Sequence, residues 1–214
     1  EPEIVGNKRN IIVSDQAGKS SLSIKLKELG FKVNDKKLNS LIKKLKKKEF
    51  EGYSYDGAEA SFELFVMREL TKVPDYFRLK SYQVINQYKD LKDSLKTNNT
   101  AKANVVVKVK KESFSNSVGN GPVNALDNAL RGVLIKSYPI LKKMNLIDYK
   151  VRILTPDEGT KAITRVIIES SDENKKSWST VGVSSNVINA SYIALKESIT
   201  YKLIKSKIKS AFEK

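Results

Sequence analysis

The segment GNGPVNALDNAL, residues 119–130, combines a glycine-rich turn with an alanine- and leucine-rich stretch. Gly119 and Gly121 let the backbone come close to a ligand. Pro122 suits the first turn of a helix, because its missing N–H group would have had no partner there. The N–H groups at a helix start can bind an anion. No Lys-Ser or Lys-Thr follows, so this is not a phosphate-binding loop of the usual kind. A plain turn with a helix cap is the alternative interpretation of the motif.

The residue types that most often carry acid–base, thiol or metal chemistry are absent. The sequence has no His and no Cys. It therefore lacks the commonest general base, the commonest metal ligand, and any thiol nucleophile or disulfide. Carboxylate pairs remain, but none stands in a glycine-framed or apolar setting. We expect no catalytic residue, no metal site and no cofactor in this chain.

The net charge of +16 is compatible with nucleic-acid binding. The densest basic run, LIKKLKKKEF (41–50), places its lysines between Leu41, Ile42 and Leu45. Together with Leu38 these residues form one apolar stripe of a helix, which leaves the lysines on the solvated face. No motif for nucleic-acid recognition is present. We expect no nucleic-acid partner, and a basic nucleic-acid-binding module is the alternative.

No segment has the features of a membrane span or an export signal. All apolar runs are much shorter than the ~20 residues that cross a bilayer, and the N-terminal residues are polar and mixed. We therefore expect a cytoplasmic protein with no membrane partner. The sequence begins at Glu1 rather than at Met, which suggests a fragment of a longer protein.

Residues 1–95 have the pattern of small helices. An irregular polar segment, 7–20, comes first, and helix-capping side chains then precede each apolar stripe. The expected helices run from about Ser20 to Leu29, over 36–48 after Asn34 and Asp35, and up to Leu70 with Asp56 as the cap.

The pattern then changes to the alternation typical of strands. We interpret the polar residues 93–104 as a joint and ANVVVKVKKESF (103–114) as one half-buried strand. The expected strands are 76–88, 103–114, 146–155, 160–170 and 177–183, and the expected helices are 122–137 and a long amphipathic helix from Ile188 onward.

An internal repeat relates these two helices. The segment VNALDNALRGVL (123–134) aligns without gaps with INASYIALKESI (188–199), so that Val123 corresponds to Ile188, and both helices follow a set of strands. The sequence therefore predicts two βββα units, in which helices cover sheets. Chance similarity of two amphipathic helices is the alternative. The expected fold class is α+β, with small helical subdomains followed by a domain of two βββα repeats.

Five segments, taken in order, resemble the C-terminal half of citramalate synthases, which are relatives of 2-isopropylmalate synthase and homocitrate synthase. The set spans nearly the whole chain. Its members are VGNKRNIIVSDQAGKSS (5–21), EGYSYDGAEASFEL (51–64), GNGPVNALDNAL (119–130), LIDYKVRI (146–153) and STVGVSSNVINASYIAL (179–195).

The resemblance implies a division of the chain. Family members condense acetyl-CoA with a 2-oxo acid on a (β/α)₈ barrel whose divalent metal is bound by a His-x-His pair. Since this sequence has no His, the barrel is absent, and the chain alone should be inactive. It would hold the linker subdomains, 1–95, and the regulatory and dimerisation domain, 96–214, of an acyltransferase.

The resemblance also implies a function. The regulatory domain would form a homodimer and mediate feedback inhibition by a branched-chain amino acid. This effector is isoleucine in citramalate synthases and leucine in 2-isopropylmalate synthases. A stand-alone amino-acid-binding domain with no enzyme is a further alternative. The choice of 2-oxo acid would be made in the missing barrel.

The effector carboxylate would lie at the glycine turn, beside apolar walls that suit an aliphatic side chain. Asp148 is a candidate for the effector's ammonium group, and a solvent-facing position is the alternative. Leu146 and Ile153 are equally compatible with an ordinary core. The effector-binding residues that the resemblance implies are Gly119, Gly121, Val123, Leu146, Tyr149, Ile153, Thr164 and Val187.

Overall fold

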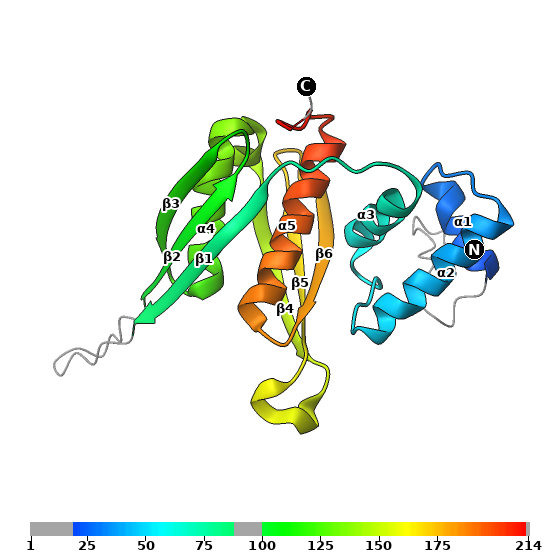
Figure 1. Ribbon diagram of the computed structural model, residues 1–214, viewed down its shortest axis with the longest axis horizontal. Helices are drawn as coiled ribbons and strands as arrows, with labels where there is room; N and C mark the ends of the chain where they lie inside the picture. Colours follow the sequence, from blue (N-terminus) through cyan, green and yellow to red (C-terminus); the bar gives the residue numbers. More distant parts are fainter. Residues whose placement is uncertain (1–18, 88–99, 213–214) are drawn as a thin grey trace.

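The computed structural model describes residues 19–87 and 100–212 of the chain. Three helices come first, and two three-stranded sheets follow, each leading into a long helix (Figure 1). This architecture confirms the predicted α+β class with two βββα units. In chain order the elements are α1 (Lys19–Glu28), α2 (Asp35–Phe50), α3 (Glu59–Leu70), β1 (Arg78–Gln87), β2 (Thr100–Lys108), β3 (Glu112–Gly119), α4 (Pro122–Ser137), η2 (Pro139–Lys143), β4 (Asn145–Ile153), η3 (Pro156–Lys161), β5 (Thr164–Ser171), β6 (Ser177–Ser184) and α5 (Val187–Lys205).

Helix α2 has the cap and the apolar stripe that the sequence predicts. Asn34 is its N-cap, and the side-chain oxygen of Asn34 accepts a hydrogen bond from the N–H of Lys37 at 2.9 Å. Leu38, Leu41 and Leu45 are buried in a small core shared with α1 and α3. Most of the lysines between them are exposed, as expected for a solvated face. The irregular segment predicted at 7–20 lies almost entirely outside the described residues.

Helix α3 is buried over Ala60–Val66, because it lies between the α1–α2 pair on one side and β6 with α5 on the other. The prediction that Asp56 caps this helix is wrong, since the N-cap is Ala58 and no side chain caps the first turn. Polar contacts tie α3 to the second unit. The Ser61 hydroxyl accepts a hydrogen bond from the N–H of Val181 at 2.9 Å, and the Arg68 guanidinium lies 2.7 Å from the Glu197 carboxylate.

The strands form two antiparallel sheets with the orders β1–β2–β3 and β4–β5–β6. The single strand predicted at 103–114 is wrong: β2 ends at Lys108, and a turn at 109–111 leads back into β3. The alternation of Val and Lys continues into that turn, so the pattern conceals it. The polar joint predicted at 93–104 is also too long, because residues from Thr100 onward pair with β1. Hydrogen bonding to the neighbouring strand β1 makes these residues a strand, although their polar composition favours a loop.

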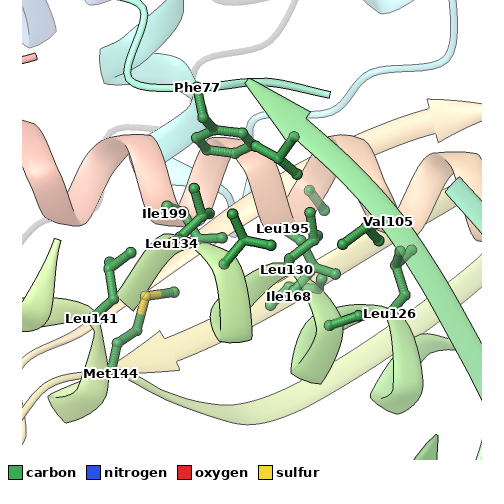
Figure 2. Close-up of a cluster of buried hydrophobic side chains, with 14 of the residues drawn as sticks. Phe77, Val105, Leu126, Leu130, Leu134, Leu141, Met144, Ile168, Leu195 and Ile199 are labelled. Atoms are coloured by element: carbon green, nitrogen blue, oxygen red, sulfur yellow. The ribbon is translucent and has the colours of Figure 1, made fainter. Parts of the chain in front are cut away.

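Helices α4 and α5 meet in one core that joins the two units. Helix α4 packs on β2 and β3, while α5 packs on β5 and β6. Figure 2 shows that buried side chains of both helices point into the same cluster, together with residues of both sheets. The labelled members are Phe77, Val105, Leu126, Leu130, Leu134, Leu141, Met144, Ile168, Leu195 and Ile199.

The repeat extends beyond the two helices. Strand β3 spans 112–119 and β6 spans 177–184, while α4 begins at Pro122 and α5 at Val187. Each of these pairs has the same spacing along the chain as Val123 and Ile188 in the aligned helix segments. The similarity of the helices therefore accompanies a repeat of the last strand and the helix of each unit.

The boundary predicted at residue 95 falls in the segment 88–99, outside the described residues. The strand before it, β1, pairs with β2 in the first sheet. The first βββα unit therefore includes 78–87, which the prediction assigned to the linker. The division into two domains stays a prediction.

An ion pair that is almost buried links the turn after β5 to α5. The Lys202 ammonium lies 3.0 Å from the Asp172 carboxylate, and 8% and 11% of these side chains are exposed. The hydrogen bond from Lys202 holds the pKa of Asp172 below its usual value, and the N–H groups of Lys176 and Asn174 act in the same direction. A lowered carboxyl pKa contributes stability above the unfolded-state pKa of about 3.9, and this contribution is lost as the pH falls through the folded-state pKa.

We therefore expect Asp172→Asn to lower the melting temperature at pH 7 and to have a smaller effect at pH 3, where the carboxyl of the unfolded wild-type chain, with a pKa of about 3.9, is mostly protonated. Thermal melts of both chains between pH 7 and pH 3 measure this. Asp157→Asn, at an exposed position in η3, is the matched control and should follow the wild type. An equal deficit of Asp172→Asn at both pH values would contradict the assignment.

Candidate functional site

A cavity of about 540 Å³ lies between α4 and the edge strand β4. One wall is formed by α4, and the other walls come from η2 and the first half of β4. Its volume is within the range of small-molecule sites, about 300–1,000 Å³. The lining residues are Val123, Asn124, Asp127, Asn128, Arg131, Ile135, Leu141, Lys142, Met144, Asn145, Leu146 and Tyr149.

The glycine turn leads into α4 as the sequence predicts. Gly121 is the N-cap, Pro122 occupies the first turn, and no side chain caps the helix. The carbonyl oxygen of Gly121 accepts the N–H of Ala125 at 3.0 Å. Within the described residues the N–H groups of Val123 and Asn124 have no partner, and both residues line the cavity. Two donors at a helix N-terminus are therefore available to an anion.

At the equivalent end of α5, the free N–H groups already have hydrogen-bond acceptors. The repeat places Asn186 at the position of Gly121, and the side-chain oxygen of Asn186 accepts the N–H groups of Ile188 and Asn189 at 2.8 and 3.1 Å. The two helices of the repeat thus differ at the cap. Asparagine satisfies the donors of α5, whereas glycine leaves those of α4 open.

Glycine suits positions 119 and 121 for different reasons. A Cβ atom at Gly119 would lie 2.4 Å from the backbone N of Ala125, so β3 can approach α4 closely only with glycine there. Gly121 has an extended backbone, and a Cβ atom there would meet nothing within 4 Å. Neither glycine lines the cavity. Gly119 positions the turn, and Gly121 keeps the helix end uncapped.

A paired acid and base form the polar part of the cavity wall. Arg131 donates through Nε to both carboxylate oxygens of Asp127 at 2.9 Å, and its Nη1 donates to the carbonyl oxygen of Met144. Both side chains are largely buried. The sequence interpretation missed this pair, although the spacing of four residues with Val123 one turn earlier places all three on one side of the predicted helix.

Leu146 and Tyr149 of β4 supply an apolar side of the cavity. The hydroxyls of Tyr149 and Ser191 lie 2.8 Å apart, and Ser191 donates to the carbonyl oxygen of Val187 at 2.6 Å. Tyr149 therefore connects the cavity to the first turn of α5.

The structure brings Val123, Leu146 and Tyr149 together around one cavity, but Ile153, Thr164 and Val187 do not line it. Thr164 is buried at the start of β5, opposite Ile153 in the ladder. Ile153 and Val187 are exposed, at 58% and 39%. The exposed side chains of Ile153 and Val187 can contribute to the same site only if another protein surface covers them.

Asp148 also lies outside the cavity lining. Its carboxylate is 2.6 Å from the ammonium of Lys150, and this hydrogen bond, with a further one from the N–H of Tyr149, lowers the pKa of Asp148. The solvent-facing alternative for Asp148 is therefore the one observed. Asp127 is the carboxylate that faces the cavity.

The described part of the chain was found to contain neither a metal-binding cluster of acidic side chains nor a membrane-spanning helix. Within residues 19–87 and 100–212, no group of three or more acidic side chains lies close enough together to hold a metal ion. No helix in these ranges combines the length and the apolar composition needed to cross a bilayer. The cavity offers N–H donors, a carboxylate, a guanidinium and an apolar wall, which is an arrangement for binding.

Residues 56–203 match the family described as the LeuA allosteric (dimerisation) domain. The chain is 51% identical to an (R)-citramalate synthase from Aquifex aeolicus over 95% of its own length, and 43% identical to that from Geobacter sulfurreducens over 96%. A 2-isopropylmalate synthase from Aquifex aeolicus is 29% identical over 95% of the chain. The chain spans only 38% of the length of each of these two citramalate synthases.

Proposed function

Because the chain belongs to the family of LeuA allosteric (dimerisation) domains, the regulatory domains of citramalate and 2-isopropylmalate synthases, we propose that it binds isoleucine and mediates feedback inhibition. The enzyme it regulates would be a citramalate synthase-like acyltransferase that uses acetyl-CoA. The higher identity to citramalate synthases favours isoleucine, and a 2-isopropylmalate synthase that senses leucine is the alternative.

The observation that carries the proposal is the composition of the cavity between α4 and β4. An α-amino acid presents a carboxylate, an ammonium group and a side chain. The N–H groups of Val123 and Asn124 suit the carboxylate, Asp127 suits the ammonium group, and Leu146 with Tyr149 suits an aliphatic side chain. All three kinds of contact face one space.

Such a cavity should select among aliphatic amino acids only partly. One methylene in an apolar pocket is worth about 1–3 kcal/mol. We therefore expect valine and leucine to bind more weakly than isoleucine, rather than not at all.

A second copy of the chain would complete the effector site. Ile147, Val151 and Ile153 on the edge strand β4, whose first half lines the cavity, and Val187 at the start of α5 are exposed apolar side chains. A symmetric dimer through this surface would cover the predicted effector residues Ile153 and Val187 and pair an open sheet edge.

The chemistry of the parent enzyme would take place outside this chain. We expect the divalent metal and the acetyl-CoA site in a catalytic barrel, and no condensation activity in this chain alone. The alternative is a stand-alone amino-acid-binding domain with no enzyme. The encoded sequence before Glu1 would distinguish the two possibilities. The cytoplasmic location also stays a prediction.

Leu146→Ala should weaken isoleucine binding about tenfold while the fold is retained, because the lost contact is worth roughly 1–2 kcal/mol at a half-buried position. Isothermal titration calorimetry with isoleucine on both chains measures the effect. Leu70→Ala removes a half-buried leucine at the end of α3, away from the cavity, and should bind isoleucine as the wild type does. If neither isoleucine nor leucine gives heat with the wild type, the proposed function is wrong.

A further inference from the structure

A second cavity, of about 650 Å³, lies beside the other long helix, α5. It is bounded by α5, by the end of α3 and by the extended segment 71–77 that connects α3 to β1. Figure 1 shows this segment crossing α5 near the C-terminal half of the helix. The second cavity shares no lining residue with the cavity between α4 and β4.

The internal repeat relates the two cavities. In the alignment that pairs Val123 with Ile188, the lining residues Asp127, Asn128, Arg131 and Ile135 correspond to Tyr192, Ile193, Lys196 and Thr200, and all four of these line the second cavity. The strands β1 and β4 begin 67 residues apart, and at this spacing the lining residues Leu141, Lys142 and Met144 correspond to Pro74, Asp75 and Phe77, which also line the second cavity. The second cavity is therefore the counterpart of the first in the other βββα unit.

The chemistry at the equivalent positions differs. Asp127, the carboxylate that faces the first cavity, is replaced by Tyr192, and Arg131 is replaced by Lys196. Burial and the neighbouring Tyr82 raise the pKa of Tyr192 to about 12, so this side chain is neutral at physiological pH. At the positions equivalent to the Asp127–Arg131 pair, the second cavity therefore has a cationic side chain but no carboxylate.

The remaining charges give the second cavity an excess of positive charge. Its two acidic side chains are both paired: Glu197 with Arg68 at 2.7 Å and Asp75 with Arg78 at 2.9 Å. Lys72 and Lys196 also line it, and neither makes an ion pair within residues 19–87 and 100–212. Two ammonium groups are therefore available to an anionic ligand.

Aromatic side chains make up much of the apolar part of the wall, and two of them are held in place by neighbouring residues. The Tyr192 ring packs on Tyr82 of β1, with centroids 6.1 Å apart. The Tyr76 ring packs edge-on against Tyr138 at 5.8 Å, and its hydroxyl donates to the carbonyl oxygen of Ile208. A fixed aromatic wall beside unpaired cations suits a ligand with an apolar body and a negative end.

We propose that the cavity beside α5 binds a small organic carboxylate that has an apolar body and no α-ammonium group. The ammonium group of an amino acid would lie near the unpaired Lys72 and Lys196 and would be repelled, since Glu197 and Asp75 are each bound by an arginine. This inference concerns a different site from the proposed isoleucine site and does not depend on it.

The test is a titration of the whole chain, followed by ¹H–¹⁵N NMR. The probes share one carbon skeleton: 3-phenylpropionate, the zwitterion L-phenylalanine and the neutral alcohol 3-phenylpropan-1-ol. We expect saturable shifts of the amides near Lys72 and Lys196 with 3-phenylpropionate, and at least tenfold weaker binding of the other two probes. Isoleucine shifts around Leu146 report the first cavity separately.

Variants assign the effect to the charges. Lys196→Met keeps the length of the side chain and should weaken 3-phenylpropionate about tenfold, whereas Lys136→Met, at an exposed position in α4, should have no effect. Tyr192→Asp places a carboxylate in the second cavity, at the position equivalent to Asp127 of the first. This variant should prefer L-phenylalanine to 3-phenylpropionate. The proposal is overturned if 3-phenylpropionate does not bind, if L-phenylalanine binds equally well, or if Lys196→Met binds like the wild type.

Discussion

Replacing Gly121 by asparagine should abolish isoleucine binding and leave the chain at least as stable as the wild type. The repeat supplies the reason, because Asn186 at the equivalent position of α5 accepts the N–H groups of Ile188 and Asn189. An asparagine at position 121 would accept the N–H groups at the start of α4 in the same way. These are the donors that the effector carboxylate is proposed to use.

The substitution should not disturb the fold. A Cβ atom at Gly121 meets nothing within 4 Å, and the extended backbone suits any residue. Asparagine as an N-cap is a few tenths of a kcal/mol better than glycine. Gly121→Asp should act in the same way and also repel the carboxylate. Loss of binding can then be separated from loss of structure.

Calorimetry with isoleucine and a thermal melt of each chain measure both parts of this expectation. Gly30→Asn is the matched control, because Gly30 has a positive φ that asparagine tolerates, has open space around it and lies between α1 and α2, far from the cavity in the chain. It should bind isoleucine as the wild type does. Unchanged isoleucine binding by Gly121→Asn would show that the end of α4 does not hold the carboxylate.

Val151→Lys should convert a homodimer into a monomer. Val151 is 48% exposed on the edge strand β4, beside the exposed Ile147 and Ile153. In a symmetric dimer through this surface, one substitution places a lysine on both sides of the interface. It removes apolar contact there and brings like charges together at a cost of several kcal/mol, on the order of what separates a stable dimer from a monomer at micromolar concentration.

Sedimentation velocity of the wild type and the variant at micromolar concentration measures the change. The control is Phe114→Lys, which replaces a side chain that is 61% exposed on β3 in the other sheet and should leave the dimer intact. A monomeric wild type would contradict the homodimer itself. A dimer that survives Val151→Lys and dissociates with Phe114→Lys would place the interface on the first sheet.

The fold class follows from local patterns, and the places where the patterns mislead have physical causes. The correspondence between the two long helices is visible because both bury the same small residues, such as Ala125 and Ala190, against a sheet. The turn at 109–111 is concealed because alternation of Val and Lys continues into it. The cap of α3 is predicted wrongly because burial on nearly every side fixes that helix without help from Asp56.

The sequence by itself determined the absence of His and Cys chemistry, the repeat of the two long helices and the glycine turn at the start of α4. These properties depend on residue type and short-range spacing, which the sequence states directly. The tertiary structure alone decided which side chains share a space. Asp127, rather than Asp148, faces the cavity because α4 turns it toward β4, while Asp148 lies on an edge strand within reach of Lys150. The second cavity depends on the path of segment 71–77 across α5, a contact between parts of the chain that are far apart in the sequence, and such contacts follow from packing rather than from local pattern.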